Sequence, residues 1–181
     1  MIKQRNNNKL YTESPAKNFL IRGNWAWLLI VSLIALLLGT VTVGEAAHHF
    51  ASEPRIISIT GNDQMKFNIT EIEVKAGEKI KIVLKNIGKI PKMGMAHNFV
   101  ILHSGVDVHN FSMAAIMARE SEYIPKDREK EIIAYTGMAG PDETVTVEFT
   151  APETPGKYDY ICTFPGHYLA GMKGVLIIND L

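Results

Sequence analysis

The sequence predicts an all-β sandwich that carries one short inserted helix and follows a single N-terminal transmembrane helix. Three observations support this prediction. From residue 55 onward the chain contains many short strand-like segments separated by closely spaced turns, which is typical of a β-sandwich. Residues 106–123 interrupt that rhythm with near-helical spacing, and residues 25–44 form an uncharged apolar run. Residues 55–181 are enough for one domain with a substantial core.

The N-terminal region divides into a basic segment, an apolar span and a short tether. Residues 1–24 carry five basic side chains against one acid, and residues 25–44 lack charge and contain two tryptophans near their start. About twenty apolar residues cross the hydrocarbon core of a bilayer, and tryptophan favours its interface. The positive-inside rule then places residues 1–24 in the cytoplasm, and the chain beyond the tether, residues 45–54, on the exported side. A cleaved signal peptide is the alternative, because residues 44–46 resemble a cleavage site.

The strand segments alternate between apolar and polar residues, which is the period of a half-buried strand. The strands expected in the first half of the domain are 55–60, 65–68, 69–74 and 79–85. A Gly- and Pro-rich loop then leads to a strand that begins near His97. The strands expected after the helix are about 131–136, 143–150, 156–162 and 173–178. Strands this short and this numerous favour two packed sheets.

Residues 106–123 are predicted to form the short helix between two strands. Phe111, Ala114 and Ala118 are among the residues that recur there at near-helical spacing. Ala, Met, Arg and Glu, which are frequent in this stretch, favour helices. Met113 and Met117 are expected to contact the core rather than to bind a metal.

One short stretch carries three side chains that bind soft metals. A thiolate, an imidazole and a thioether are available at Cys162, His167 and Met172. Between the first two, Pro165 and Gly166 form a turn that lets the loop fold back, so that its side chains can reach one ion. For each residue alone, a buried cysteine or a core methionine is the simpler interpretation. Taken together, these residues favour a metal site.

A second imidazole is expected from His97, which directly precedes a buried-looking strand. Two histidines, one cysteine and a distant axial methionine are the ligands of blue copper electron-transfer sites. The sequence therefore predicts one type 1 copper ion held by His97, Cys162, His167 and Met172. Cys162 is the only cysteine, so the exported domain has no internal disulfide, and metal ligation would protect the thiol from oxidation.

These segments resemble azurin and the auracyanin-type cupredoxins. Cys-Thr-Phe-Pro-Gly-His, beginning at Cys162, and the later Met-Lys-Gly are similar to the metal loop of that family, although the spacing before the methionine is one residue longer than in azurin. Met-Ala-His-Asn, ending at Asn98, is similar to its Met-Gly-His-Asn, and the similarity covers roughly residues 55–178. It implies a Greek-key cupredoxin sandwich in which Asn98 ties the two ligand loops together and the backbone N–H of Phe164 points at the sulfur. Ala96 replaces the glycine of azurin, so its carbonyl is at most a weak axial contact.

An apolar rim is expected around His167, where loops from several parts of the chain should gather. A contiguous exposed apolar patch marks a binding surface. The residues expected in this rim are Met93, Met95, Met138, Phe164, Pro165, Leu169 and Ala170. We therefore predict weak, transient docking of redox proteins there, and no organic substrate. The chain lacks the basic, aromatic-interleaved pattern of nucleic-acid binding, so no nucleic-acid partner is expected.

The predicted function is that of a membrane-anchored electron carrier rather than an enzyme. Copper enzymes with several copper sites need further histidine clusters, and this chain has no His-x-His motif. Copper delivery or storage is the alternative, although it would favour exposed Met and His repeats. The copper domain is expected in the periplasm or outside the cell, either anchored by residues 25–44 or, after signal cleavage, soluble.

Overall fold

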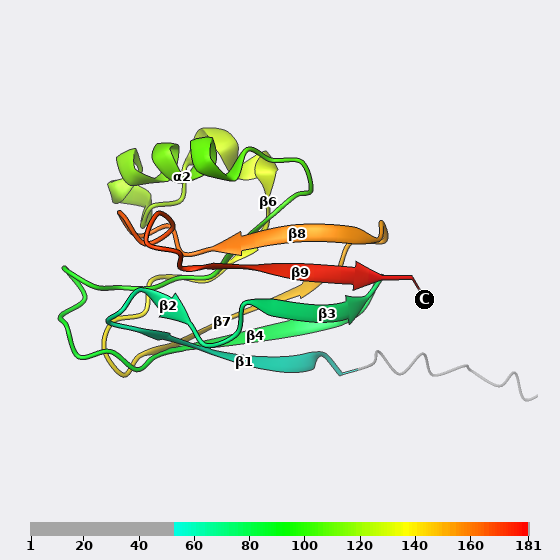
Figure 1. Ribbon diagram of the computed structural model, residues 1–181, viewed down its shortest axis with the longest axis horizontal. Helices are drawn as coiled ribbons and strands as arrows, with labels where there is room; N and C mark the ends of the chain where they lie inside the picture. The colour runs from blue at the N-terminus through cyan, green and yellow to red at the C-terminus, as the bar shows by residue number, and fades with distance from the viewer. Residues whose placement is uncertain (1–52, 181) are drawn as a thin grey trace, which may run out of the picture. The chain divides into compact units, whose positions relative to one another are not determined.

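The structure, a computed structural model, describes residues 53–180. In this part of the chain two β-sheets pack face to face, and a short helix lies against the outer side of one of them (Figure 1). The predicted sandwich with a short helix is therefore confirmed. Within residues 53–180 no helix is long and apolar enough to cross a membrane. The span predicted at residues 25–44 lies outside the described residues.

Within the described part of the chain, one sheet has four strands and the other has five. The four-stranded sheet has the order β2-β1-β4-β7. Its strands are β1 (Arg55–Asn62), β2 (Lys66–Phe67), β4 (Lys79–Asn86) and β7 (Thr144–Thr150). The five-stranded sheet has the order β3-β9-β8-β5-β6. Its strands are β3 (Glu71–Lys75), β5 (Val100–Leu102), β6 (Ile132–Tyr135), β8 (Gly156–Ile161) and β9 (Lys173–Asn179). Because β1 runs parallel to β4 and β3 parallel to β9, the chain crosses between the sheets to place these neighbours together.

The predicted strand bounds agree with β4, β6, β7, β8 and β9 to within one residue at each end. The strand predicted at 55–60 continues to Asn62, and the strand predicted at 69–74 begins at Glu71 and ends at Lys75. Two further predictions differ more from the structure. Only Lys66 and Phe67 form a strand in the segment predicted at 65–68. The strand expected near His97 begins at Val100, because His97 itself forms an isolated bridge with Ala139.

The core lies between the two sheets and comes from alternating residues of their strands. Along β4, Ile80, Ile82 and Leu84 are fully buried, whereas the lysines of that strand are partly or fully exposed. In the core, the rings of Phe99 and Tyr160 stack with their centroids 4.8 Å apart. Burying a large apolar side chain stabilises a fold by about 1.5–3 kcal/mol, so a core of this kind can hold the sandwich without a disulfide.

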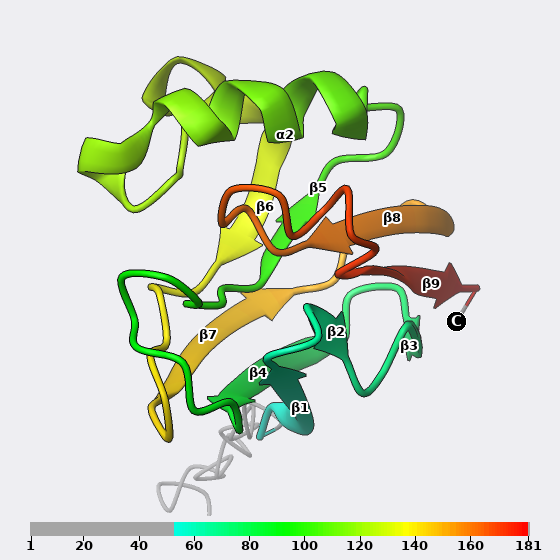
Figure 2. The same ribbon diagram turned by 60° about the vertical axis from the view of Figure 1, so that its left-hand side comes forward.

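The inserted helix, α2 (Val108–Met117), covers the outer face of the five-stranded sheet near β5 and β6 (Figure 2). It begins after Asp107, whose carboxylate accepts a hydrogen bond from the N–H of Asn110 at 3.0 Å. A side-chain acceptor at this position satisfies one of the unpaired N–H groups of the first turn. Two short 3₁₀ helices follow, η1 (Arg119–Ser121) and η2 (Lys126–Glu131).

The prediction that Met113 and Met117 contact the core is wrong. Both side chains are exposed, and Met117 is exposed to 85%. The buried residues of α2 are Phe111, Ser112 and Ala115, and the two methionines lie on the opposite side of the helix. An Ala- and Met-rich stretch favours a helix, but it does not determine which of its faces packs against the sheet.

Candidate metal centre

The loop that joins β8 to β9 carries three of the predicted ligands. Cys162 directly follows β8 and Met172 directly precedes β9. The N–H of Cys162 donates to the carbonyl of Met172 at 3.1 Å, which closes the base of the loop. Inside the loop, the N–H of His167 donates to the carbonyl of Phe164 at 3.1 Å, and Gly166 has a φ of 83°, which favours glycine. The predicted Pro-Gly turn is therefore confirmed, and it brings His167 back toward Cys162.

His97 reaches the same place from a segment distant in sequence. Its N–H and carbonyl pair with the carbonyl and N–H of Ala139, at 3.0 and 2.8 Å. The buried side-chain amide of Asn86, the last residue of β4, donates to the same Ala139 carbonyl at 3.0 Å. These contacts tie the backbone of His97 to the four-stranded sheet.

The side chains of His97, Cys162 and His167 meet in the protein interior. One possible ligand atom from each residue lies within 4.8 Å of the others, and all three residues are buried. The two Nδ1 atoms are 3.2 Å apart, and the Sγ of Cys162 is 3.4 Å from the Nδ1 of His167. Met172 is also fully buried. Its methyl carbon lies close to the ring of His97. Both groups contact Gly61: a Cβ added to that glycine would lie 2.9 Å from the methyl carbon and 2.8 Å from the Cδ2 of His97.

This donor set fits a metal ion. The Nδ1 atoms of His97 and His167 and the Sγ of Cys162 converge on one point. One proton shared between the two nitrogens would leave the sulfur without a partner, whereas a metal ion can bind all three atoms. Among the described residues, the buried Nε2 of His97 has no partner with hydrogen-bond geometry. Burial lowers the pKa of this ring, and the nearby backbone of Asn62 opposes that shift only in part. A ring that binds a metal through Nδ1 keeps its proton on Nε2, facing Asn62. Thiolate, thioether and imidazole together are the donors that select copper.

Burial controls the protonation of the ligands. It raises the pKa of the Cys162 thiol to about 12, an effect that hydrogen bonds from the backbone at Asn98 and Phe164 partly oppose. Burial, together with neighbouring His97, lowers the pKa of His167 to about 4, and burial also lowers the pKa of His97. In the metal-free protein at neutral pH, the thiol is protonated and both imidazoles are neutral. A metal ion therefore displaces a proton from the sulfur and none from the imidazoles.

Asn98 joins the two ligand segments, as the resemblance implies. Its Nδ2 donates to the Oγ1 of Thr163 at 2.8 Å, and its Oδ1 accepts the N–H of Thr163 at 2.8 Å. Since Asn98 follows His97 and Thr163 follows Cys162, these two buried hydrogen bonds set the spacing between a histidine and the cysteine. Thr163 was not predicted as a site residue from the sequence; a hydroxyl directly after the cysteine is the signal that could have revealed it.

Replacing Asn98 by alanine is expected to lower the free energy of unfolding of the metal-free protein by about 1–3 kcal/mol. The change leaves the buried N–H and hydroxyl of Thr163 without partners. Urea unfolding followed by circular dichroism measures the loss. Asn68→Ala is the matched control, because the Asn68 side chain accepts one exposed hydrogen bond, from the N–H of Thr60. Equal losses for the two variants would contradict the role given to Asn98.

The remaining predicted neighbours of the metal also lie at the site. The carbonyl oxygen of Ala96 is 4.0 Å from the Sγ of Cys162, so it faces the centre, and a weak axial contact with copper stays a prediction. The ring of Phe164 packs against the ring of His167 with centroids 4.7 Å apart. The ring of Phe164 also packs against the ring of Tyr123, with centroids 5.3 Å apart. An aromatic layer therefore covers the edge of the centre.

The residues predicted for the apolar rim differ in their exposure. Met93 is exposed to 81% and Leu169 to 61%, and each belongs to a segment that carries ligands. Met95, Pro165 and Ala170 are partly exposed. Met138 is exposed to only 6%, so it adds little to the accessible surface, although it lines a hollow of about 160 Å³ together with Met93 and Phe164.

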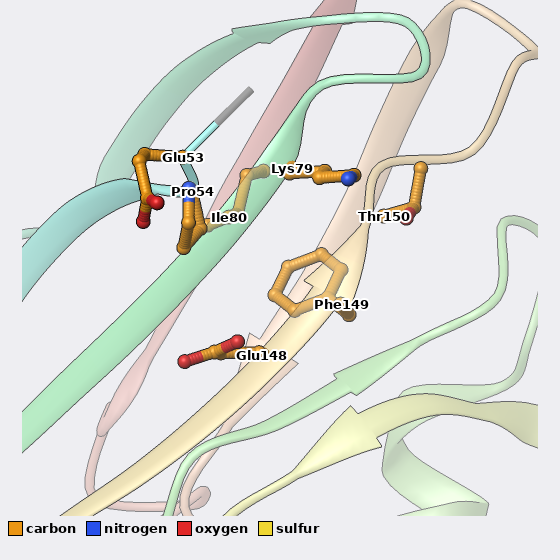
Figure 3. Close-up of a pocket in the computed structure, with 7 residues that line it drawn as sticks. All are labelled: Glu53, Pro54, Lys79, Ile80, Glu148, Phe149 and Thr150. Atoms are coloured by element: carbon orange, nitrogen blue, oxygen red, sulfur yellow. The ribbon is translucent and has the colours of Figure 1, made fainter. Parts of the chain in front are cut away.

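A larger surface hollow, of about 390 Å³, lies at the other end of the four-stranded sheet. It is lined by Glu53, Pro54, Lys79, Ile80, Glu148, Phe149 and Thr150 (Figure 3). Lys79 pairs with Thr150 at this end of β4, whereas Asn86, at the opposite end, contacts the His97 segment. The residues that line this hollow include no histidine, cysteine or methionine. Among residues 53–180, the group of side chains close enough together to hold a metal ion is the buried cluster of His97, Cys162 and His167.

A β-sandwich that gathers a thiol, two imidazoles and a thioether in its buried interior defines a type 1 copper protein. The comparisons with known proteins agree. Residues 56–179 match the model of a family described as copper binding proteins, plastocyanin/azurin family. The chain therefore belongs to the plastocyanin/azurin family. Its type 1 copper site is formed by His97, Cys162, His167 and Met172, and such a protein is an electron carrier, not an enzyme.

Individual relatives match about two thirds of the chain. Auracyanin-B of Chloroflexus aurantiacus is 35% identical over 118 residues, which are 65% of this chain and 48% of that protein, so the chain spans about half the length of this relative. Azurin-1 of Alcaligenes xylosoxydans xylosoxydans is 38% identical over 130 residues, covering 68% of this chain and 97% of that protein. The solved structure of auracyanin A, a "blue" copper protein from Chloroflexus aurantiacus, is 36% identical with a TM-score of 0.63, and covers 70% of this chain and 100% of that one.

Proposed function

We propose that this protein is a membrane-anchored electron carrier that exchanges electrons with other redox proteins across the apolar surface beside His167. One observation carries the proposal. The buried ligands lie in the same two segments as the exposed apolar side chains of Met93 and Leu169. The place where a partner can approach through apolar contact is thus only a few residues from the metal ligands.

The described residues have separate tasks in such an exchange. Copper bound at the centre would supply the one-electron redox change. Phe164 packs against the ring of His167 and Tyr123 packs against Phe164, so these rings would limit the access of water to the centre. Met93 and Leu169 offer a small apolar contact, which favours brief docking over a stable complex. The family implies redox proteins as the partners.

Membrane anchoring rests on the sequence of the N-terminal region. Residues 25–44 have the length and apolar character of a single span, and basic residues precede them. Residues 45–54 would then tether the copper domain to the exported face of the membrane. A tethered carrier searches for membrane-bound partners at a high effective concentration.

Replacing Leu169 by glutamate is expected to slow electron self-exchange between two copies of the protein by about tenfold. Two like charges would then face each other when two apolar surfaces meet. Line broadening in NMR spectra of mixed oxidation states measures this rate. Ile56→Glu is the matched control: Ile56 is exposed to 64%, close to the 61% of Leu169, but it pairs with Lys81 in β4, away from the metal ligands. Equal rates for both variants would contradict docking at Leu169.

Fractionation of cells that express the full chain tests the anchor. An anchored protein sediments with membranes, resists an alkaline carbonate wash and dissolves only in detergent. Sequencing of its N-terminus should then begin before residue 25. Recovery of a soluble exported protein that begins near residue 45 would establish signal cleavage instead, and would leave the electron-carrier assignment untouched.

A further inference from the structure

One wall of the metal centre comes from a turn that the ligand segments do not include. Gly61, near the end of β1, is buried and lies between two partners: it pairs with Phe67 in β2 and with Asn86 in β4. Its carbonyl accepts the N–H of Ile87 at 2.9 Å. The backbone of Gly61 is therefore fixed from both sides and cannot move away from the centre at low cost.

Gly61 leaves no room for a side chain. A Cβ at this position would lie 2.8 Å from the Cδ2 of His97 and 2.9 Å from the methyl carbon of Met172. Carbon atoms in favourable contact are about 3.5–4.0 Å apart, so one added methyl group would have to displace a ligand. The φ of Gly61 is not in the left-handed region, so its backbone conformation does not require glycine. The close approach of two ligands is the physical reason for glycine at this position.

The same turn makes a second contact with the loop of Met172. The ammonium group of Lys66 donates to the carbonyl of Ala170 at 2.5 Å. Lys66 pairs with Asn62, the residue after Gly61, so both contacts come from one turn of the four-stranded sheet. Gly171, between Ala170 and Met172, has a φ of +92°, and a Cβ there would meet the Lys66 nitrogen at 2.8 Å.

We propose that Gly61 and Lys66 are positioning residues that set where the thioether of Met172 lies relative to the copper ion. The proposal rests on the type 1 copper site described above. Gly61 limits how far the methyl end of Met172 can extend, and Lys66 holds the loop that precedes it. The backbone of His97 is held by two hydrogen bonds to Ala139, and its ring is rigid. The side chain of Met172 has three rotatable bonds and adapts more easily. Crowding at Gly61 is therefore expected to displace the methionine. Since the axial ligand tunes the redox potential of such sites, this turn also tunes it.

The test compares Gly61→Ala with Gly94→Ala in the copper-loaded full-length protein. Gly94 lies in the loop before His97, also outside the left-handed region, and a Cβ there would meet its nearest atom at 3.6 Å, an ordinary contact. We expect Gly61→Ala to change the intensity ratio of the two sulfur-to-copper charge-transfer bands by about twofold and to shift the reduction potential. Copper stoichiometry should stay unchanged, and Gly94→Ala should match the parent protein. A band ratio in Gly61→Ala equal to that of the parent would overturn the proposal.

A double-mutant cycle separates crowding of Met172 from a general disturbance. In a Met172→Ala background, the added Gly61→Ala change should alter the bands by much less than it does in the parent. An equal change in both backgrounds would overturn the proposal. Lys66→Met serves if Gly61→Ala does not fold: it should shift the same band ratio, and an unchanged ratio counts against the role of this turn. A parent protein that gives no charge-transfer band at all would instead refute the copper site itself.

Discussion

Replacing Cys162 by serine is expected to abolish the intense sulfur-to-copper charge-transfer band and to weaken copper binding by more than about 100-fold. Loss of a residue that merely supports a ligand costs about 10–100-fold in metal affinity, so loss of the thiolate itself should cost more. The Sγ of Cys162 lies 3.4 Å from the Nδ1 of His167, inside the cluster that converges on one point. Optical titration of the metal-free protein with Cu(II), with a chelator as competitor, measures both effects.

Folding of the Cys162→Ser variant is the necessary control. The hydroxyl is close in size to the thiol, and the backbone N–H groups of Asn98 and Phe164, which face the sulfur, can donate to it. The metal-free variant should therefore keep the circular dichroism spectrum of the parent. A folded variant that still gives the intense band would remove Cys162 from the ligand set.

Copper binding is expected to release one proton per ion near neutral pH. The pKa of the Cys162 thiol is raised to about 12, so the metal-free protein holds this proton, whereas the copper-bound thiolate does not. Because the bound state holds fewer protons, the apparent affinity should rise about tenfold for each unit of pH between about pH 6 and 9. The pKa of His167 is lowered to about 4, so its imidazole contributes no proton in this range and steepens the dependence only in more acidic solution.

Competition titrations at several pH values measure the slope, and titration in weakly buffered solution measures the released proton directly. The Cys162→Ser variant is the matched control, because its hydroxyl does not ionise in this range. An affinity that is independent of pH between about pH 6 and 9 would mean that the thiol is already ionised in the metal-free protein.

The ligand set could be predicted from the sequence because its chemistry is concentrated in few places. Cys162, His167 and Met172 lie in one loop, and His97 stands at the head of a buried segment. The ends of strands with strict alternation, such as β4, could also be predicted, because the polarity of each residue indicates which face of the sheet it lies on.

The remaining features depend on contacts between segments far apart in sequence. In the sequence, Gly61 precedes Asn62 and Asp63, a combination typical of an ordinary turn. Its closeness to His97 and Met172 arises from the pairing of β1 with β4 in the folded protein. The orientation of Met117 depends on which side of α2 meets the sheet. The burial of Met138 depends on how its loop packs beside the His97 segment, through the bridge at Ala139. No local pattern in the sequence contains this information.

The hydrogen bonds that hold both ligand segments have a consequence for the rate of electron transfer. His97 is paired with Ala139, Cys162 with Met172, and Asn98 with Thr163, all through atoms that do not bind the metal. We therefore expect the ligands to keep nearly the same positions around Cu(II) and Cu(I), so that little nuclear rearrangement accompanies each electron transfer. A low reorganisation barrier lets such a carrier work with partners whose potentials differ only slightly from its own.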